Sequence, residues 1–305
     1  EIYAIPGMKD MADNMCFLLN QDMMEDLDLT FPETYNTYHD VYPFIYEAQE
    51  KRDAKYPEKA GNPIMGGLTT RFINWYNIEP LLGGDTAIVA ANIPGLTGVE
   101  GMGDGETAYC PFYTDEYREI MKIKRQMVVD GVAPFDSENF DVDQVLWRNG
   151  DLLGATSRGY LFVEPDMYAP YFTTTLEQSD VSIMSTSVIQ NSGQAISASS
   201  ENIERALEYL ELVNNDTYLA TILRFGAEGD YWTDEDNDGI LEWGPLNEDS
   251  GSRGWYNWYG WQYGSIVVSK YPAGYPADFG QIVKDFNASA NREANLGFIV
   301  NTENI

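Results

Sequence analysis

The chain has 305 residues, which is enough for a large buried core and for two lobes. It carries 18 Lys and Arg against 49 Asp and Glu, and the resulting formal net charge of −31 repels nucleic-acid phosphates and anionic lipid headgroups. No window reaches the ~20 apolar residues of a transmembrane helix, and the first residues lack the basic and apolar regions of a signal peptide. Nucleic-acid binding and membrane spanning are therefore disfavoured.

The first half of the chain alternates strand-like and helical patterns. We expect a short buried strand over 2–6, where the sequence reads as the middle of a strand rather than a natural terminus. The spacing of apolar residues predicts helices over 17–24, 34–52, 68–82 and 140–148. Thr114 is predicted to cap a further helix that ends at 130–131, because its hydroxyl can accept a backbone hydrogen bond and Asp115 suits the helix dipole.

The second half continues in the same way. Strands are expected over 154–163 and within 181–197. Ser199 or Ser200 is expected to cap an amphipathic helix whose apolar stripe includes Ile203 and Leu207. Helices are predicted in three places: 201–213, 217–225 and 279–289. Short strands alternating with helices indicate the α/β class.

The sequence has few candidates for nucleophilic or zinc chemistry. Cys16 and Cys110 can form one disulfide or remain two buried free thiols. His39 is the single histidine, so a zinc site and a Ser-His-Asp triad are both disfavoured.

An acidic loop resembles an EF-hand loop that lacks its last ligand. Asp234, Asp236, Asp238 and Gly239 fit positions 1, 3, 5 and 6 of that motif. The carbonyl of Ile240 and the carboxylate of Glu242 could add ligands, but Pro245 occupies the twelfth position, where the motif places a bidentate Glu. We expect this loop to bind a structural Ca²⁺. No other cofactor is predicted. The alternative is a plain hairpin turn at 237–239.

The most aromatic stretch of the chain, 255–263, follows this loop. Aromatic rings with polar tips suit a ligand that is apolar on one face and hydroxylated at its edge, as a sugar is. The candidates are Trp255, Trp258 and Trp261, together with Arg253 just before them. The alternatives are core packing for the rings and a structural ion pair for the arginine.

Several short segments stand in a fixed order along nearly the whole chain. They are Tyr-Ala-Ile-Pro at 3–6 with Lys-Asp at 9–10, Leu-Asn-Gln-Asp at 19–22, Trp-Arg-Asn-Gly-Asp at 147–151, the helix at 200–210, Phe-Gly-Ala-Glu-Gly-Asp-Tyr at 225–231, Phe-Asn at 286–287 and Leu-Gly-Phe at 296–298. In that order they resemble the extracellular solute-binding proteins of ABC importers, sugar-type, in the lipoprotein-LipO-like branch.

The resemblance implies an α/β, two-lobe periplasmic-binding-protein-like (type II) fold with hinge strands. A full member of the family has further segments before and after the part that this chain matches, so we expect the fold to be incomplete at both ends. The expected organisation is a hinge-crossing strand at 1–9, a second lobe at 10–170, a return segment in the first lobe at 171–228, and the acidic loop, aromatic segment and closing helices at 229–305.

The resemblance also implies candidate ligand contacts. Residues after the crossing strand face the cleft in such proteins, which nominates Lys9, Asp10, Asp13 and Asn14; a solvated turn is the alternative. By position in the chain, a second set of candidates is Trp75, Tyr76, Arg158 and Tyr160. Core packing for the aromatic residues and a structural ion pair for Arg158 are the alternatives.

The implied function is the substrate-binding component of an ABC transporter. It would capture a carbohydrate, in particular an oligosaccharide, between two lobes without chemistry and deliver it to permease subunits, as a monomer anchored outside the cell as a lipoprotein. Three alternatives stay open: a peptide or other solute binder on the same scaffold, a glycoside hydrolase with a carboxylate pair, and a calcium-stabilised surface adhesion module.

Overall fold

The structure is a computed structural model that describes residues 4–35, 38–66, 76–82, 87–133, 146–147, 149–158, 161–162, 172–190, 192–248 and 262–297. The chain forms two compact units: unit 1 contains residues 1–12 and 187–289, and unit 2 contains residues 13–186 and 290–305. The chain therefore passes from one unit to the other three times. These crossings lie at 12–13, 186–187 and 289–290.

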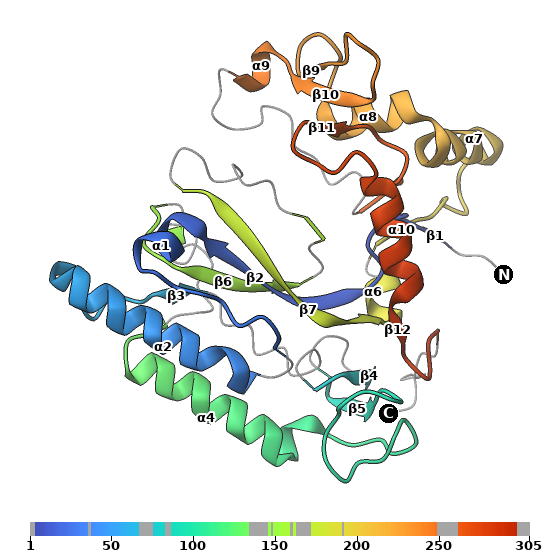
Figure 1. Cartoon of the computed structure of the whole chain (residues 1–305). Coiled ribbons are helices and arrows are strands. Elements are labelled where there is room, and N and C mark those ends of the chain that lie inside the picture. Colours follow the sequence, from blue (N-terminus) through green and yellow to red (C-terminus); the bar gives the residue numbers. More distant parts are fainter. Residues whose placement is uncertain are drawn as a thin grey trace. The chain divides into compact units, whose positions relative to one another are not determined.

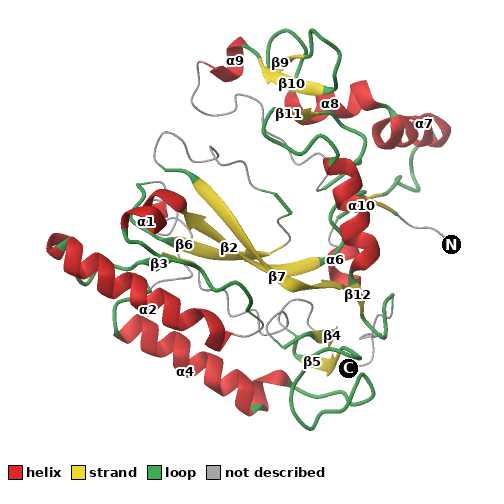
Figure 2. Ribbon diagram, in the orientation of Figure 1, coloured by secondary structure: helices red, strands yellow, loops and turns green. Residues whose placement is uncertain are grey.

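Unit 2 is built on a five-stranded mixed sheet with the order β12–β7–β2–β6–β3 (Figure 2). The central strand β2 (Asp13–Asn20) pairs antiparallel with β6 (Gly154–Arg158) and with β7 (Thr174–Met184). The edge strands β3 (Met65–Gly66) and β12 (Asn291–Arg292) pair parallel with β6 and β7, respectively. Because β12 follows the passage through unit 1, the last described part of the chain returns to complete this sheet.

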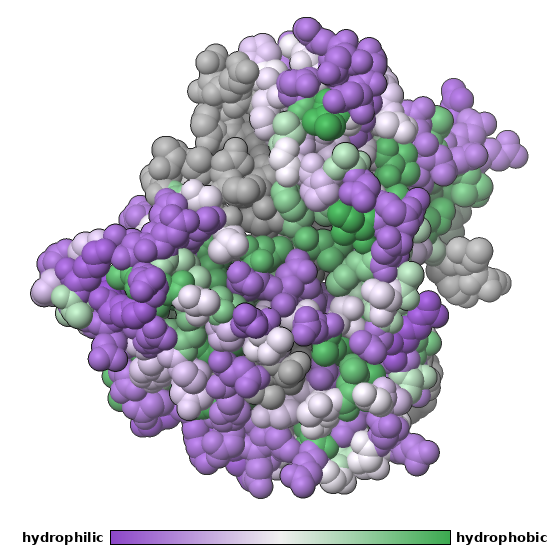
Figure 3. Space-filling model, in the orientation of Figure 1, coloured by the Kyte–Doolittle hydropathy of each residue, from purple (hydrophilic) through white to green (hydrophobic). Residues whose placement is uncertain are grey.

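Both faces of β2 are covered by apolar side chains. Phe17 and Leu19 lie in a large core with residues of α2 (Tyr38–Lys55) and α4 (Asp115–Val129), whereas Leu18 packs with Trp147 and Phe172 in a separate cluster. Alternate side chains of a strand point to opposite faces, so the sheet has a core on each side. Figure 1 shows α2 and α4 side by side along one face, and Figure 3 shows mainly hydrophilic side chains on their outer surface.

The remaining elements of unit 2 connect these layers. Helix α1 (Gln21–Asp26) directly follows β2, and Asn20 caps it by accepting a hydrogen bond from the backbone N–H of Met23 at 3.0 Å. The other elements are η1 (Pro57–Lys59), the antiparallel pair β4 (Ile78–Leu82) and β5 (Val89–Asn92), and η3 (Pro111–Tyr113).

Unit 1 contains two small sheets and several helices. Strand β1 (Ile5–Pro6) pairs antiparallel with β8 (Gly193–Gln194). The second sheet has the order β11–β10–β9, formed by Tyr271–Pro272, Ile240–Trp243 and Trp232–Thr233. The helices are α6 (Thr186–Gln190), which starts at the second crossing, α7 (Ile203–Asn215), α8 (Thr217–Phe225), α9 (Pro245–Glu248) and α10 (Phe279–Ser289).

Trp232 is the largest fully buried side chain described in the molecule, with 1% of its surface exposed. It packs with Phe225 and Leu241, and its indole N–H donates to the carbonyl of Gly226 at 2.8 Å. This contact fixes β9 against the end of α8, and with it the start of the acidic loop. No helix in the described parts of the chain has the length and hydropathy needed to cross a membrane.

Three of the predicted helices match the structure closely, since helices occupy 115–129, 217–225 and 279–289 and Thr114 caps the first of them at 3.2 Å. The helix predicted over 34–52 is α2, in which His39 is exposed. Cys16 and Cys110 are both free thiols, Cys16 being buried and Cys110 partly exposed.

Other predicted elements were wrong. The helix over 17–24 is the strand β2 followed by α1, because a continuous apolar run suits a strand that is covered on both faces. Residues 78–82 form the strand β4, not the end of a helix, and the strand at 5–6 is exposed rather than buried. Within 181–197 the expected strands are present, as the end of β7 at Met184 and as β8 at Gly193–Gln194, but helix α6 lies between them.

The helix predicted over 201–213 is confirmed as α7, but its cap and the burial of its first turns differ from the prediction. It starts at Ile203 after Asn202, whose side chain makes no capping bond, instead of being capped by Ser199 or Ser200. Leu210 is buried near its end, but Ile203 is 48% exposed, because the described packing partners of this helix gather at its C-terminal half. Of the helix predicted over 140–148, only 146–147 lie within the described residues.

In unit 2, a buried glutamate links the place where the chain leaves the unit, at Thr186, to the place where it returns, at Ala290. Glu293, just after β12, is 4% exposed, and its Oε2 accepts a hydrogen bond from the backbone N–H of Thr186 at 2.9 Å. Its Oε1 is buried without a hydrogen-bond partner among the described residues. Burial raises the pKa of Glu293 to about 8, with a further contribution from the nearby carboxylate of Glu79.

In unit 1, Asn287 of α10 fastens the segment that precedes the first crossing. Its side-chain oxygen accepts a hydrogen bond from the N–H of Met11 at 2.7 Å, and its amide donates to the carbonyl of Lys9 at 2.7 Å. One side chain thus satisfies a donor and an acceptor of a chain segment that lies 276 to 278 residues away in sequence.

We expect Asn287→Ala to lower the free energy of unfolding by about 2 kcal/mol, because two backbone groups lose their partner and each net hydrogen bond contributes ~1 kcal/mol. Urea unfolding followed by tryptophan fluorescence would measure this. Lys284→Ala, at an exposed position of the same helix, is the control and should change stability by less than ~0.5 kcal/mol. Equal effects of the two variants would contradict the role given to Asn287.

Candidate functional site

On the unit 1 side of the first crossing, the predicted contacts Lys9 and Asp10 occupy different environments. The Lys9 side chain is 2% exposed, whereas Asp10 is only partly buried. The backbone here is held by unit 1, since the N–H of Met8 donates to the carbonyl of Gly264 at 2.9 Å and the N–H of Ile266 donates to the carbonyl of Met8 at 2.8 Å. Lys9 is therefore a buried cation of unit 1 rather than part of a solvated turn.

The charge of Asp10 affects the pKa of Tyr271, a residue that was not among the predicted ligand contacts. Burial is the largest cause that raises the pKa of Tyr271, and the charge of Asp10 raises it further. The guanidinium of Arg224 lies 4.7 Å from the centre of the Tyr271 ring and donates to the hydroxyl of Ser269 at 3.0 Å. An acid, a tyrosine and an arginine thus gather beside the start of the crossing, within unit 1.

On the unit 2 side, the predicted contacts Asp13 and Asn14 are the first residues of β2, and both are buried. The pairing of β2 with β7 shifts register between Asn14 and Cys16. At this irregularity the N–H of Met15 donates to the hydroxyl of Ser179 at 3.1 Å. Bulges occur preferentially near functional sites because they redirect side chains.

Arg158 is placed at the same end of the sheet. It is the last residue of β6 and is the cross-strand partner of Met15, next to Asn14 in the chain. The side chain of Arg158 lies outside the described part of the structure. Three of the predicted ligand-binding residues, Asp13, Asn14 and Arg158, therefore share one end of two neighbouring strands.

Asn14 is the most informative of these residues. It is 2% exposed, and its side-chain carbonyl oxygen has no hydrogen-bond partner among the described residues. An unpaired buried acceptor costs about 1–3 kcal/mol, so such groups are rare unless a ligand or water completes them. The oxygen of Asn14 is therefore ready to accept a hydrogen bond from a hydroxyl group.

The acidic loop joins β9 to β10 in unit 1, and the carboxylates of Asp234, Asp236 and Asp238 offer oxygens that lie within 4.8 Å of one another. The loop turns through left-handed backbone at Asn237 (φ +58°) and Gly239 (φ +87°), where glycine carries no steric cost. The N–H of Ile240 donates to the carboxylate of Asp238 at 2.8 Å. The other predicted ligand, Glu242, is an exposed residue of β10 outside this group.

Lys270, the residue directly before β11, contacts this loop. Lys270 donates a hydrogen bond from its ammonium group to Oδ2 of Asp234, whose side chain is 1% exposed. This ammonium group is the main cause that holds the pKa of Asp234 below its usual range. The contact follows from topology, because β10 pairs parallel with β11 and aligns Ile240 with Tyr271, the residue after Lys270.

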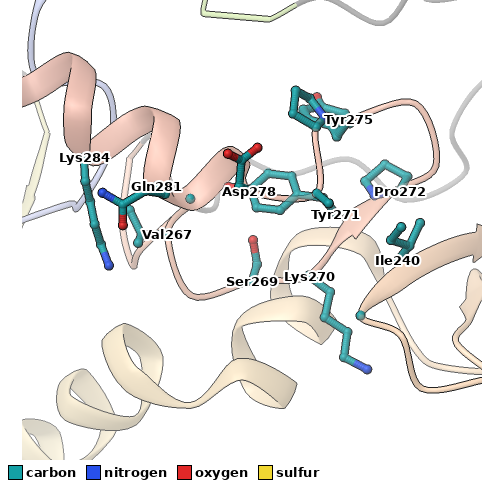
Figure 4. A pocket seen from close by; sticks show the side chains of 14 residues that line it. Ile240, Val267, Ser269, Lys270, Tyr271, Pro272, Tyr275, Asp278, Gln281 and Lys284 are labelled. Carbon is teal, nitrogen blue, oxygen red and sulfur yellow. The ribbon is translucent and has the colours of Figure 1, made fainter.

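A cavity of about 290 Å³ lies beside Lys270 within unit 1. Figure 4 shows it between the start of α10 and the strands β10 and β11, with the side chains of Tyr271, Tyr275, Asp278 and Gln281 around it. Its size approaches the lower limit of ordinary small-molecule pockets. These lining residues are missing from the sequence predictions, because no local motif marks them.

Of the remaining residues predicted to contact the ligand, the structure describes only Tyr76. Tyr76 is partly buried, and desolvation raises its pKa, with additional effects of Glu116 and Glu119. It packs against the main core of unit 2, in agreement with the alternative of core packing. Trp75, Tyr160, Arg253, Trp255, Trp258 and Trp261 lie outside the described residues. Tyr263, at the end of the aromatic stretch, packs on Val213 and Ala220 in unit 1.

Comparison with known proteins gives structural neighbours only. No protein-family model and no curated protein matches the sequence. The crystal structure of the N-glycan transport solute binding protein NgtS from Streptococcus pneumoniae superposes with a TM-score of 0.73 at 18% identity, over 100% of this chain and 63% of NgtS. NgtS in complex with Man5GlcNAc gives a TM-score of 0.66 at 19% identity, over 99% and 62%.

A third neighbour is the alginate-binding protein AlgQ2 without calcium ion, with a TM-score of 0.51 at 13% identity, over 94% of this chain and 59% of AlgQ2. The chain thus spans less than two thirds of the length of these proteins. The likeness establishes the fold: the chain has the α/β, two-lobe periplasmic-binding-protein-like fold of solute-binding proteins.

Proposed function

We propose that this protein is the substrate-binding component of an ABC importer and that it captures a carbohydrate, in particular an oligosaccharide, without chemical change. The observation that carries the proposal is the unpaired carbonyl oxygen of Asn14, buried at the polar end of the unit 2 sheet next to a chain crossing. The fold supports it, since NgtS, which shares that fold, has been crystallised with Man1GlcNAc and Man5GlcNAc.

The proposed contacts follow the chemistry of the side chains. Asn14 accepts a hydrogen bond from a sugar hydroxyl, and Asp13 and Arg158 bind further hydroxyls from the same end of the sheet. Lys9, Asp10 and the tryptophans at 255, 258 and 261 remain proposed sugar contacts, the tryptophans because flat aromatic faces suit sugar rings. A dissociation constant near 1 μM corresponds to about −8 kcal/mol, which a few such contacts can supply.

We further propose how the protein works in its setting. Permease subunits are its partners, the protein is a monomer, and a lipoprotein anchor holds it outside the cell. Movement of the units about the three crossings would admit and release the ligand. The competing functions, namely a peptide binder, a glycoside hydrolase and an adhesion module, differ from this one in what happens to an added ligand.

A binding screen tests the proposal. Purified protein is mixed with mannose-containing N-glycan fragments, other oligosaccharides, monosaccharides and peptides; thermal shift identifies ligands, calorimetry measures affinity and small-angle scattering measures compaction. We expect an oligosaccharide to bind, to compact the protein and to be recovered intact by mass spectrometry. Preferred binding of peptides, cleavage of the sugar, or binding without compaction would each contradict the proposal and favour one competitor.

A further inference from the structure

The acidic loop of unit 1 contains a buried carboxylate oxygen without a hydrogen bond of normal geometry, although the backbone N–H groups of Asp238 and Gly239 help to lower the pKa of the same carboxyl group. Oδ1 of Asp234 is buried and has no hydrogen-bond partner among the described residues. It belongs to the same carboxylate whose Oδ2 binds Lys270, and the Asp234 side chain is 1% exposed. Since Asp236 and Asp238 bring their oxygens within 4.8 Å of this group, the buried oxygen lies inside a cluster of three carboxylates.

The chemistry of this cluster selects a hard cation. Calcium takes six to eight oxygen ligands at about 2.3–2.6 Å and accepts irregular geometry, whereas magnesium requires a near-octahedral site. Alternate aspartates followed by a glycine at a left-handed turn are the arrangement by which EF-hand loops present such oxygens. The twelfth position is Pro245, so the loop has fewer protein ligands than an EF-hand and its affinity should be correspondingly low.

Lys270 neutralises part of the charge that a metal ion would use. Its ammonium group binds Asp234 and lies 5.9 Å from the centre of the Trp232 ring, so it is held on two sides. The Lys270 side chain is 26% exposed and also lines the 290 Å³ cavity, where Asp278 provides another carboxylate (Figure 4). The lysine therefore has solvent-accessible space beside it if it leaves Asp234.

We propose that the Asp234–Asp236–Asp238 loop is a calcium site in which the ammonium group of Lys270 competes with the metal ion for Asp234. In the metal-free protein Lys270 compensates the buried carboxylate. When calcium binds, it takes over Asp234 and completes its coordination with Asp236, Asp238 and water, and Lys270 turns toward the cavity. Two positive charges at one carboxylate repel each other, so the lysine sets the calcium concentration at which the loop fills.

The test uses the whole chain, freed of metal with EDTA and dialysed, and titrated with CaCl₂ in a calorimeter. We expect the wild-type protein to bind one calcium ion with a dissociation constant on the order of 10⁻⁴–10⁻³ M, the range of weak extracellular sites. Lys270→Met should bind calcium about tenfold more tightly, because the competitor is removed. Its melting temperature should fall without calcium, and added calcium should restore it.

Matched variants separate the two parts of the proposal. Asp236→Asn should weaken binding at least ~10-fold, whereas Glu235→Gln, with the same charge change at an exposed neighbour outside the cluster, should leave it unchanged. If Lys270→Met does not fold, Lys270→Gln serves in its place. Calcium binding of equal strength in the wild-type and Lys270 variants would refute the competition, and the absence of binding in both would refute the site.

Discussion

Replacing Glu293 with glutamine should stabilise the protein at pH 9 and leave its stability at pH 5 nearly unchanged. The carboxyl group is 4% exposed, and burial raises its pKa from 4.5 to about 8. Between these two values the folded protein holds a proton on Glu293 that the unfolded chain has already released. Folding is therefore disfavoured progressively as the pH rises from ~4.5 to ~8, and the loss is complete above ~8.

Glutamine removes this dependence because its amide resembles the protonated carboxyl group in shape and cannot ionise. Its carbonyl oxygen can still accept the N–H of Thr186. The difference between the variant and the wild type should reach on the order of 3 kcal/mol at pH 9, which is a large part of the stability of an ordinary domain.

Urea unfolding at pH 5, 7 and 9 would measure the effect. Glu50→Gln, at an exposed position of α2, is the control and should shift stability by less than ~0.5 kcal/mol at every pH. A Glu293→Gln variant whose advantage is the same at pH 5 and pH 9 would show that the carboxyl group is already ionised at pH 5, contrary to the effect of burial.

Replacing Asn14 with leucine should separate ligand binding from stability. The two side chains have similar volumes, but leucine lacks the carbonyl oxygen that is buried and unpaired in the structure. The ligand-free variant should be as stable as the wild type or more stable by up to ~2 kcal/mol, since a desolvated acceptor is removed. Its affinity for the best sugar from the binding screen should fall about 30-fold, which corresponds to ~2 kcal/mol.

Calorimetry and thermal unfolding of the same samples would give both quantities. Asn214→Leu is the matched control, because the side chain of Asn214 donates to the carbonyl of Leu210 within its own helix and lies in unit 1, whereas β2 belongs to unit 2. It should leave the sugar affinity unchanged. If Asn14→Leu lowers stability and leaves affinity unaltered, then Asn14 is a structural residue and the proposed site is wrong.

Local signals in the sequence predicted the helices well where a capping residue and a stop signal agree. Helix α8 begins after Asp216, which accepts the N–H of Leu219 at 2.7 Å, and ends at Gly226 with φ +92°, so both limits follow from residue chemistry. Strand β2 was missed for a tertiary reason. Its run Met15–Leu19 has no helical or alternating period, and only the layers above and below it decide that it is a strand.

The candidate site shows the same limit. The spacing of Asp234, Asp236 and Asp238 was sufficient to predict their proximity, because they lie in one turn. Lys270 was not predictable, since the parallel pairing of β10 with β11 brings it to Asp234 from 36 residues away. The unpaired oxygen of Asn14 was also hidden, because it depends on an irregular pairing between two strands more than 160 residues apart, as for Met15 and Ser179.

The position of β2 has a consequence for how the protein is made. This strand is synthesised well before its hydrogen-bonding partners, β6 and β7, since Met15 and Ser179 are 164 residues apart. At about 5–20 residues per second, ribosomes leave this strongly apolar segment without its neighbours for on the order of ten seconds. During biogenesis this segment therefore exposes apolar side chains that a chaperone can bind until β6 and β7 have been made.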